Sequence, residues 1–200
     1  MDNRDLVYHG LAIKRHAEAP AIAELIGLPK DHVASLLQTA AATGRAVEAK
    51  GAYILSPLAR IGLEARYALH FGHLREDKAF NAAYQSFERI NRTLKQVITE
   101  WQTIEVGGRK VANDHSDKAH DEAIIDRLGA VHEQVETVLN ALGAKLPRMK
   151  IYAKKLLHAL EAAEDGDHEW VSDIRRESYH TVWFELHEDL LRIMGQVREE

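Results

Sequence analysis

Most of the chain repeats its apolar residues at the spacing of an α-helix. After about residue 76, apolar positions recur three and four residues apart through four long segments, the pattern of helices that each bury one stripe. These segments are joined at Gly107-Gly108, Gly143 and Gly166, and the double glycine Gly107-Gly108 is interpreted as a flexible connection. Helices of this length with short connections predict an antiparallel bundle. The four segments are residues 77–104, 118–142, 147–164 and 170–198.

The first part of the chain has shorter elements. Residues 4–17 are predicted to form a helix, and Ala21–Ile26 a second one that stops at Gly27-Leu28-Pro29. A third helix follows Pro29 and stops at Gly44. Two short apolar runs, Ala46–Ala49 and Ala52–Leu55, then flank Lys50-Gly51, which predicts a tight hairpin. This order of helices followed by a two-stranded wing is typical of a winged helix-turn-helix domain.

The expected fold is therefore mainly α, with two domains. Residues 1–72 are predicted to be a winged helix-turn-helix domain. Residues 73–200 are predicted to be an antiparallel four-helix domain that mediates dimerisation or binds an effector or a partner.

Composition narrows the class of protein. The chain has no cysteine, which excludes disulfides, thiolate metal sites and cysteine nucleophiles and favours a reducing cytoplasm. No apolar run reaches the ~20 residues needed to cross a bilayer, and the N-terminus lacks the pattern of a signal peptide. We therefore expect a soluble cytoplasmic protein that does not enter a membrane.

Charge is distributed unevenly along the chain. Residues 1–70 carry eight Lys/Arg against seven Asp/Glu, and residues 71–200 carry eighteen against twenty-four. The second part should repel nucleic acid, so any binding of a polyanion is expected in the first part.

Four passages of the chain resemble known protein families. The stretch GAYILSPLARIGLEARY, residues 51–67, is similar to the passage from the wing strand into the next helix in MarR-type and PadR-type regulators. Together with FERINRTLKQVITEWQ, NDHSDKAHDEAIIDRL and SYHTVWFELHEDLL, it resembles an actinobacterial-type family with a winged-helix head and a helical C-terminal domain. Similar segments are associated with phosphoenolpyruvate-utilising, dikinase-like proteins. The resemblance implies a fold and a regulatory role but no catalytic residues.

The third predicted helix and the wing supply a candidate DNA-binding surface. In a winged helix this helix enters the major groove and the wing contacts the backbone or the minor groove. The polar side chains can bond base edges, and the cations can bind phosphates. The alternative is a winged helix that only packs against protein. The candidate residues are Lys30, Ser35, Gln38, Thr39, Arg45 and Lys50.

A second candidate site lies in the predicted helical domain. On a helix through SYHTVWFELHEDLL, two histidines fall on the apolar arc. The other arc is polar, and its glutamates are expected mostly to face solvent. The residues of this polar arc are Thr181, Glu185, Glu188, Asp189 and Arg192. The histidines are either core groups with structural hydrogen bonds or part of a ligand pocket with aromatic walls. The candidate pocket residues are Asn91, Trp101, Tyr179, His180, Trp183 and His187.

Two other motifs are weaker indications of a functional site. Glu177 and His180 have the spacing of di-iron bundles, but Asp117–His120 and Asp165–His168 share it by chance, and no metal or cofactor is expected. The stretch NDHSD, residues 113–117, is interpreted as a capping loop with Asp117 or Ser116 as the cap.

The sequence thus favours a non-enzymatic regulator, because no nucleophile is paired with a base. The first hypothesis is a winged-helix, DNA-binding transcriptional regulator that acts as a homodimer or with a protein partner. The alternative is an accessory subunit of a phosphoenolpyruvate-utilising dikinase-like phosphotransferase, which uses the winged helix for protein contact.

Overall fold

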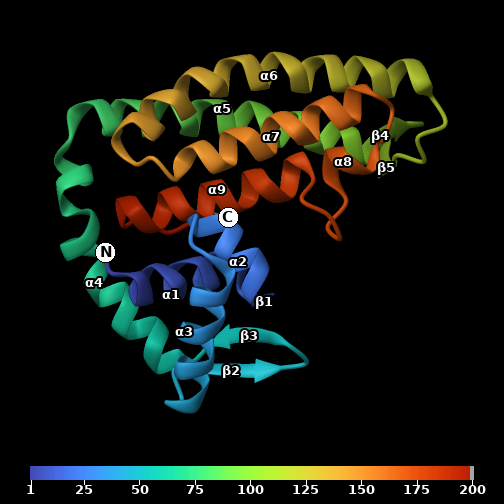
Figure 1. Cartoon of the computed structure of the whole chain (residues 1–200). Coiled ribbons are helices and arrows are strands. Elements are labelled where there is room, and N and C mark those ends of the chain that lie inside the picture. Colours follow the sequence, from blue (N-terminus) through green and yellow to red (C-terminus); the bar gives the residue numbers. More distant parts are fainter. Residues whose placement is uncertain (199–200) are drawn as a thin grey trace. The chain divides into compact units, whose positions relative to one another are not determined.

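Helices form most of residues 1–198, the part of the chain that the computed structural model describes (Figure 1). The mainly α fold predicted from the sequence is confirmed. The chain forms two units. Unit 1 comprises Met1–Asp77 and the residues from Glu185 onward, and unit 2 comprises Lys78–Phe184. Within residues 1–198, no helix combines the length and the apolar character that crossing a membrane requires.

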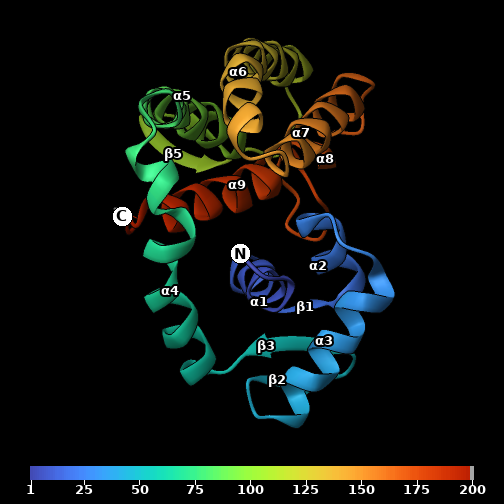
Figure 2. The same ribbon diagram turned by 60° about the vertical axis from the view of Figure 1, so that its left-hand side comes forward.

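Unit 1 combines short helices with a small sheet. The three strands are antiparallel and have the order β1-β3-β2, and the β2–β3 hairpin pairs in the register that the sequence predicts. Figure 2 shows α1 between α4 on one side and α2 and α3 on the other. The elements are α1 (Asn3–Lys14), β1 (Ala17–Glu18), α2 (Ala19–Ile26), α3 (Lys30–Ala42), β2 (Ala46–Ala49), β3 (Ala52–Leu55) and α4 (Pro57–Glu76).

Local chemistry sets the ends of these elements. The Asp2 carboxylate accepts a hydrogen bond from the backbone N–H of Asp5 at the start of α1. Ser56 caps α4 in the same way, with Pro57 at the first helical position. The β2–β3 turn has positive φ at both Lys50 and Gly51, the conformation of the two-residue turn that matches strand twist.

Unit 2 contains three long helices, a hairpin and a short helix. The α5 helix packs against α6, and α6 packs against α7. The last helix, α9 (Tyr179–Met194), begins in unit 2 and continues into unit 1. The other elements are α5 (Lys78–Gln102), β4 (Thr103–Val106), β5 (Arg109–Ala112), α6 (Lys118–Lys145), α7 (Met149–Glu164) and α8 (Glu169–Ser172).

Two predictions for this region were wrong. The glycines Gly107-Gly108 do not form a flexible connection, because they make the turn of the antiparallel β4–β5 hairpin, with φ of 58° and 77°. The final helix is not continuous over residues 170–198. It is interrupted after α8, where Asp173 accepts a hydrogen bond from the backbone N–H of Arg175. It restarts at Tyr179, just after Ser178, whose hydroxyl accepts a hydrogen bond from the N–H of Thr181.

The end of the chain groups differently from the sequence prediction, which placed all of residues 73–200 in one domain. Residues from Glu185 onward belong to unit 1. The reason is visible in the polar arc of α9: Asp189 is fully buried and lies 2.8 Å from His9 Nε2, and Glu185 pairs with Lys14 at 2.9 Å. The expectation that the glutamates of this arc mostly face solvent was wrong, because the Glu185 and Glu188 side chains are only 15% and 14% exposed.

A chain of hydrogen bonds extends from this contact. His9 Nδ1 lies 2.9 Å from the Tyr67 hydroxyl, which is also hydrogen-bonded to Arg192. One order gives each of these hydrogen bonds a donor and an acceptor: Arg192 donates to the Tyr67 oxygen, the Tyr67 hydroxyl donates to His9 Nδ1, and His9 Nε2–H donates to Asp189. Burial raises the pKa of Tyr67 to about 12, so its hydroxyl keeps its proton.

We expect Asp189→Ala to lower the free energy of unfolding of unit 1 by about 3–5 kcal/mol, because it leaves a buried histidine without its carboxylate. Urea denaturation, with hydrogen exchange of the α1 amides, measures the change. The control is Asp126→Ala, which removes an exposed carboxylate on α6. Equal losses in the two variants would contradict a structural role for the buried pair.

Candidate functional site

All six predicted DNA-binding side chains are exposed on α3 and the β2–β3 hairpin. The α3 helix turns Val33, Leu37 and Ala40 into the core of unit 1, so the intervening positions Ser35, Gln38 and Thr39 point outward. The structure thus places these three polar residues on one helix, as the sequence predicts.

The three cations lie at the ends of the same elements. Lys30 is the first residue of α3, Arg45 precedes β2, and Lys50 lies in the hairpin turn. Within residues 1–198, the ion pairs of the structure do not involve these three side chains, so their charges are available to a ligand. The Thr39 hydroxyl, in contrast, donates to the Ser35 carbonyl oxygen at 2.9 Å and retains only its acceptor capacity.

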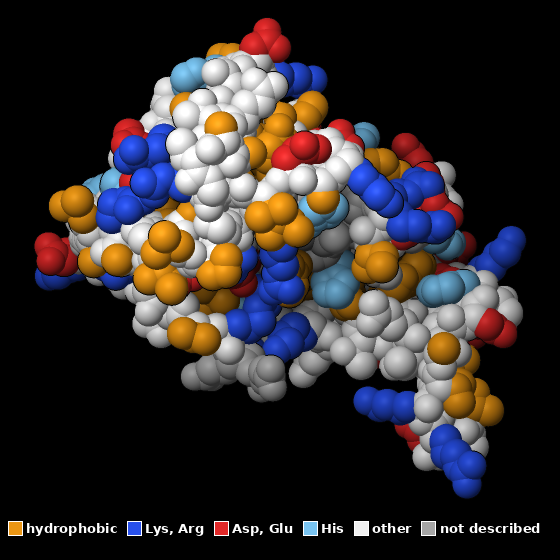
Figure 3. Space-filling model, turned by 90° about the horizontal axis from the view of Figure 1, so that it is seen from below, with side chains coloured by type: hydrophobic (Ala, Val, Ile, Leu, Met, Phe, Trp, Pro, Cys, Tyr) orange, Lys and Arg blue, Asp and Glu red, His pale blue; other side chains and the backbone are white. Residues whose placement is uncertain are grey.

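This surface carries acidic as well as basic side chains. Asp31 and Glu48 are exposed beside the cations, and the Glu48 carboxylate accepts a hydrogen bond from the N–H of Gly51 in the turn. Figure 3 shows Lys and Arg side chains in separate groups, interspersed with exposed hydrophobic side chains. Such a surface offers a few phosphate contacts, and its electrostatic contribution to binding is correspondingly small.

The six predicted pocket residues do not form one site. Asn91 is buried and its Oδ1 accepts a hydrogen bond from Trp183 Nε1 at 2.9 Å. Trp183 stacks on Phe87 and on Tyr179, with ring centroids 4.9 and 6.0 Å apart, and the Tyr179 hydroxyl lies 3.3 Å from His132 Nδ1. These contacts make a packed polar–aromatic cluster, in which Asn91 has a structural partner.

The other three predicted residues lie elsewhere. Trp101 packs against His115 and His168, with ring centroids 4.5 and 5.6 Å away. His180 is only half-buried, and burial lowers its pKa. His187 belongs to unit 1, where its Nδ1 lies 3.1 Å from an Arg198 nitrogen. A helical wheel places His180 and His187 on one arc, but their surroundings differ.

The NDHSD loop has a capping role, as the sequence predicts. The Asp117 carboxylate accepts a hydrogen bond from the N–H of His120 at the start of α6. Asn113 and His115 form hydrogen bonds of 3.0 Å to the buried carboxylate of Asp121. This loop therefore anchors the end of the β4–β5 hairpin to α6.

An open pocket of about 440 Å³ lies beside the β4–β5 hairpin. It is built from the end of α5, the hairpin and the start of α6, and none of the predicted pocket residues lines it. Its walls are Thr99, Glu100, Thr103, Ile104, Glu105, Lys110, Asp117 and His120. Across residues 1–198, no group of three or more His, Asp and Glu side chains is placed to hold a metal ion.

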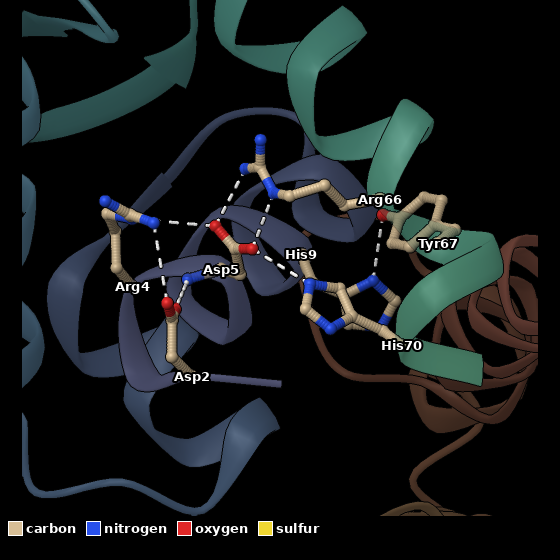
Figure 4. A network of polar contacts seen from close by, with 7 residues as sticks. All are labelled: Asp2, Arg4, Asp5, His9, Arg66, Tyr67 and His70. Carbon is tan, nitrogen blue, oxygen red and sulfur yellow. Dashed lines mark hydrogen bonds and ion pairs between the residues drawn. The ribbon is translucent and has the colours of Figure 1, made fainter.

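Sequence reasoning missed a polar cluster between α1 and α4 (Figure 4). Asp5 is 1% exposed and accepts two hydrogen bonds from Arg66, at 2.7 and 2.8 Å, and one from His70 Nε2 at 2.9 Å. Burial alone raises the pKa of Asp5, but the hydrogen bonds from Arg66 and His70 outweigh it and lower the pKa to about 2. The available signal was the helical spacing of Asp5 and His9 beside that of Arg66 and His70.

Comparisons of the chain with protein-family models, with curated proteins and with solved structures found no match.

We expect Asn91→Leu to lower the free energy of unfolding of unit 2 by roughly 1–3 kcal/mol, because the buried N–H of Trp183 loses its acceptor. Urea denaturation followed by tryptophan fluorescence reports on this unit, since Trp101, Trp170 and Trp183 all lie within it. In a Trp183→Phe background, where this N–H is absent, Asn91→Leu should cost less than in the parent chain. A stability equal to that of the parent chain would contradict the packed cluster and favour a solvated interior.

We expect Asp5 to stabilise unit 1 at neutral pH. Its folded pKa of about 2 lies below that of an unfolded aspartate, so the stabilisation is complete above about pH 4 and is lost as the pH falls towards 2. Because Arg66 is 38% exposed, solvent screening limits the effect to about 1–2 kcal/mol. The measurement is the unfolding free energy of the parent and of Asp5→Asn between pH 7 and pH 3. A difference that stays constant with pH would contradict it.

Proposed function

We propose that the protein is a non-enzymatic, DNA-binding regulator whose unit 1 is a winged helix-turn-helix domain. The observation that carries the proposal is the element order α1-β1-α2-α3-β2-β3-α4, with the β2–β3 hairpin following α3. In such a domain α3 is the recognition helix and the hairpin is the wing. The exposed polar and cationic side chains on these two elements are the groups that such a mode of binding requires.

Each side chain has a role in this proposal. Ser35, Gln38 and Thr39 contact base edges from the outward face of α3, with Gln38 able both to donate and to accept. Lys30 and Arg45 bind phosphates at the ends of α3, and Lys50 binds a phosphate from the tip of the hairpin. Three cations per subunit predict a modest affinity and a shallow dependence on salt for one subunit.

A competing proposal is that the same surface binds protein, as an accessory subunit of a phosphotransferase would. The exposed apolar pair on the hairpin favours it: Val47 and Ile54 face each other across β2 and β3 and are 58% and 41% exposed. Exposed apolar pairs of this kind are common at protein interfaces. In this case the substitution of Val47 and Ile54, and not of the cations, weakens binding of the partner.

We expect Lys30→Ala, Arg45→Ala and Lys50→Ala each to weaken binding to duplex DNA and to reduce the slope of log K against log salt by about 0.9 per contact and subunit. The measurement is fluorescence anisotropy with duplexes selected from a random library. Lys95→Ala, an exposed cation on α5, is the matched control and should leave binding unchanged. Failure to select any duplex at about 50 mM salt would rule out the DNA-binding proposal.

A further inference from the structure

The α4 helix presents an apolar stripe to solvent. At 100° per residue, seven positions from Leu58 to Gly72 fall within one arc of about 120°. Its three large side chains are far from buried, since Leu58, Ile61 and Leu69 are 78%, 64% and 81% exposed. Every position on the arc is Leu, Ile, Ala or Gly. The positions are Leu58, Ile61, Gly62, Ala65, Ala68, Leu69 and Gly72.

The opposite face of α4 is occupied. Leu63, Tyr67, Phe71 and Leu74 are buried in unit 1, and Arg66 bonds to Asp5. Burial within unit 1 therefore accounts for one face of the helix and leaves the apolar stripe uncovered. Figure 3 shows exposed hydrophobic side chains along the left of the view, the side on which Figure 1 places α4. Uncovered apolar stripes of this length on soluble proteins are usually interaction surfaces.

The stripe is complementary to itself. If two copies of α4 pack antiparallel about a two-fold axis at Ala65, residues whose numbers add to 130 lie at the same level, so Leu58 is level with Gly72 of the second copy and Ile61 with Leu69. Ile61 and Leu69 lie on opposite flanks of the stripe, so Ile61 has Ala68 of the second copy on its own flank, and Leu69 has Gly62. Each large side chain therefore has a small residue of the second copy beside it, which favours close helix packing.

The glycine positions have the room that this pairing needs. A Cβ built on Gly72 meets no atom within 4 Å, so the space in front of it is open to a side chain from another molecule. At Gly62 the nearest atom is an Arg66 nitrogen at 3.5 Å, at the end of a flexible side chain. A two-fold interface uses the same patch on both subunits, and the open space at Gly62 and Gly72 lets this stripe pack against a second copy of itself.

From these observations we propose that the protein forms a homodimer through antiparallel packing of α4 against α4 of a second copy, centred on Ala65. The proposal is independent of DNA binding. The contact from Leu58 to Gly72 is about 21 Å long, at the small end for a specific interface, so the dissociation constant is expected in the micromolar range.

Sedimentation of the full chain over a range of micromolar concentrations tests the dimer. Leu69→Glu and Ile61→Glu are expected to weaken association by about tenfold or more, because each places a charge in the apolar contact. Ile174→Glu is the matched control, since Ile174 is 86% exposed but lies outside α4. A chain that remains monomeric at about 100 µM, or a dimer that both charged variants leave intact, overturns the proposal.

A substitution without charge separates packing from general surface effects. Gly72→Leu fills the space opposite Leu58 of the second copy while raising the helix propensity of α4. The variant is expected to be at least as stable as the parent chain but to dimerise about tenfold more weakly. Unchanged dimerisation would overturn the pairing of Leu58 with Gly72.

Cross-linking tests the antiparallel register directly, because the native chain has no cysteine. Under mild oxidation, Ala65→Cys is expected to form a disulfide-linked dimer. Leu58→Cys alone is not expected to do so, because the two copies of residue 58 are about 21 Å apart along the helix axis. A mixture of Leu58→Cys and Gly72→Cys should cross-link to each other. Efficient self-linking of Leu58→Cys, or none by Ala65→Cys, overturns the antiparallel pairing.

Discussion

The buried contact between His9 and Asp189 is the constraint on which unit 1 depends. Both side chains are fully buried, and they come from positions 180 residues apart in the chain. A buried carboxylate is tolerated only where it is paired and hydrogen-bonded, so the C-terminal part of α9 has to dock where His9 presents its ring. The first residues of the chain and the C-terminal part of α9, from Glu185, therefore belong to one unit. The candidate DNA-binding elements α3 and the β2–β3 hairpin are built on that unit.

Unit 2 has the character of a packed scaffold around Asn91. The amide satisfies the indole of Trp183, which in turn stacks between Phe87 and Tyr179. Asn91 lies on the apolar arc of α5 because the Trp183 indole supplies its buried partner. The open pocket lies instead beside the β4–β5 hairpin, at the far end of α5 from the α4 connection. This pocket would be one candidate site for an effector of the proposed regulator.

One face of α4 packs in unit 1, and the opposite face carries the exposed apolar stripe. Arg66, Tyr67 and His70 complete the polar clusters with Asp5 and His9 and fix the helix in unit 1. The outward stripe, with its alternation of large and small residues, remains for association. Because α4 follows the β2–β3 hairpin directly, a dimer through α4 would set the distance between the two candidate DNA-binding surfaces. Dimerisation through α4 and DNA binding by unit 1 are therefore compatible.

The sequence by itself determined α1, α2, α3, α5, α6 and α7, the Lys50-Gly51 hairpin, the Asp117 cap and the exposure of the candidate residues on α3, but not the break between α8 and α9. These features follow from local periodicity and turn chemistry, which act over a few residues. Only the tertiary structure decided that Asp189 is buried while Glu48 is exposed, that Trp101 is separate from Asn91, and that Gly107-Gly108 close a hairpin. The physical reason is that burial of a polar side chain depends on the partner it meets. Those partners, such as His9 for Asp189 and Arg66 for Asp5, come from distant parts of the chain.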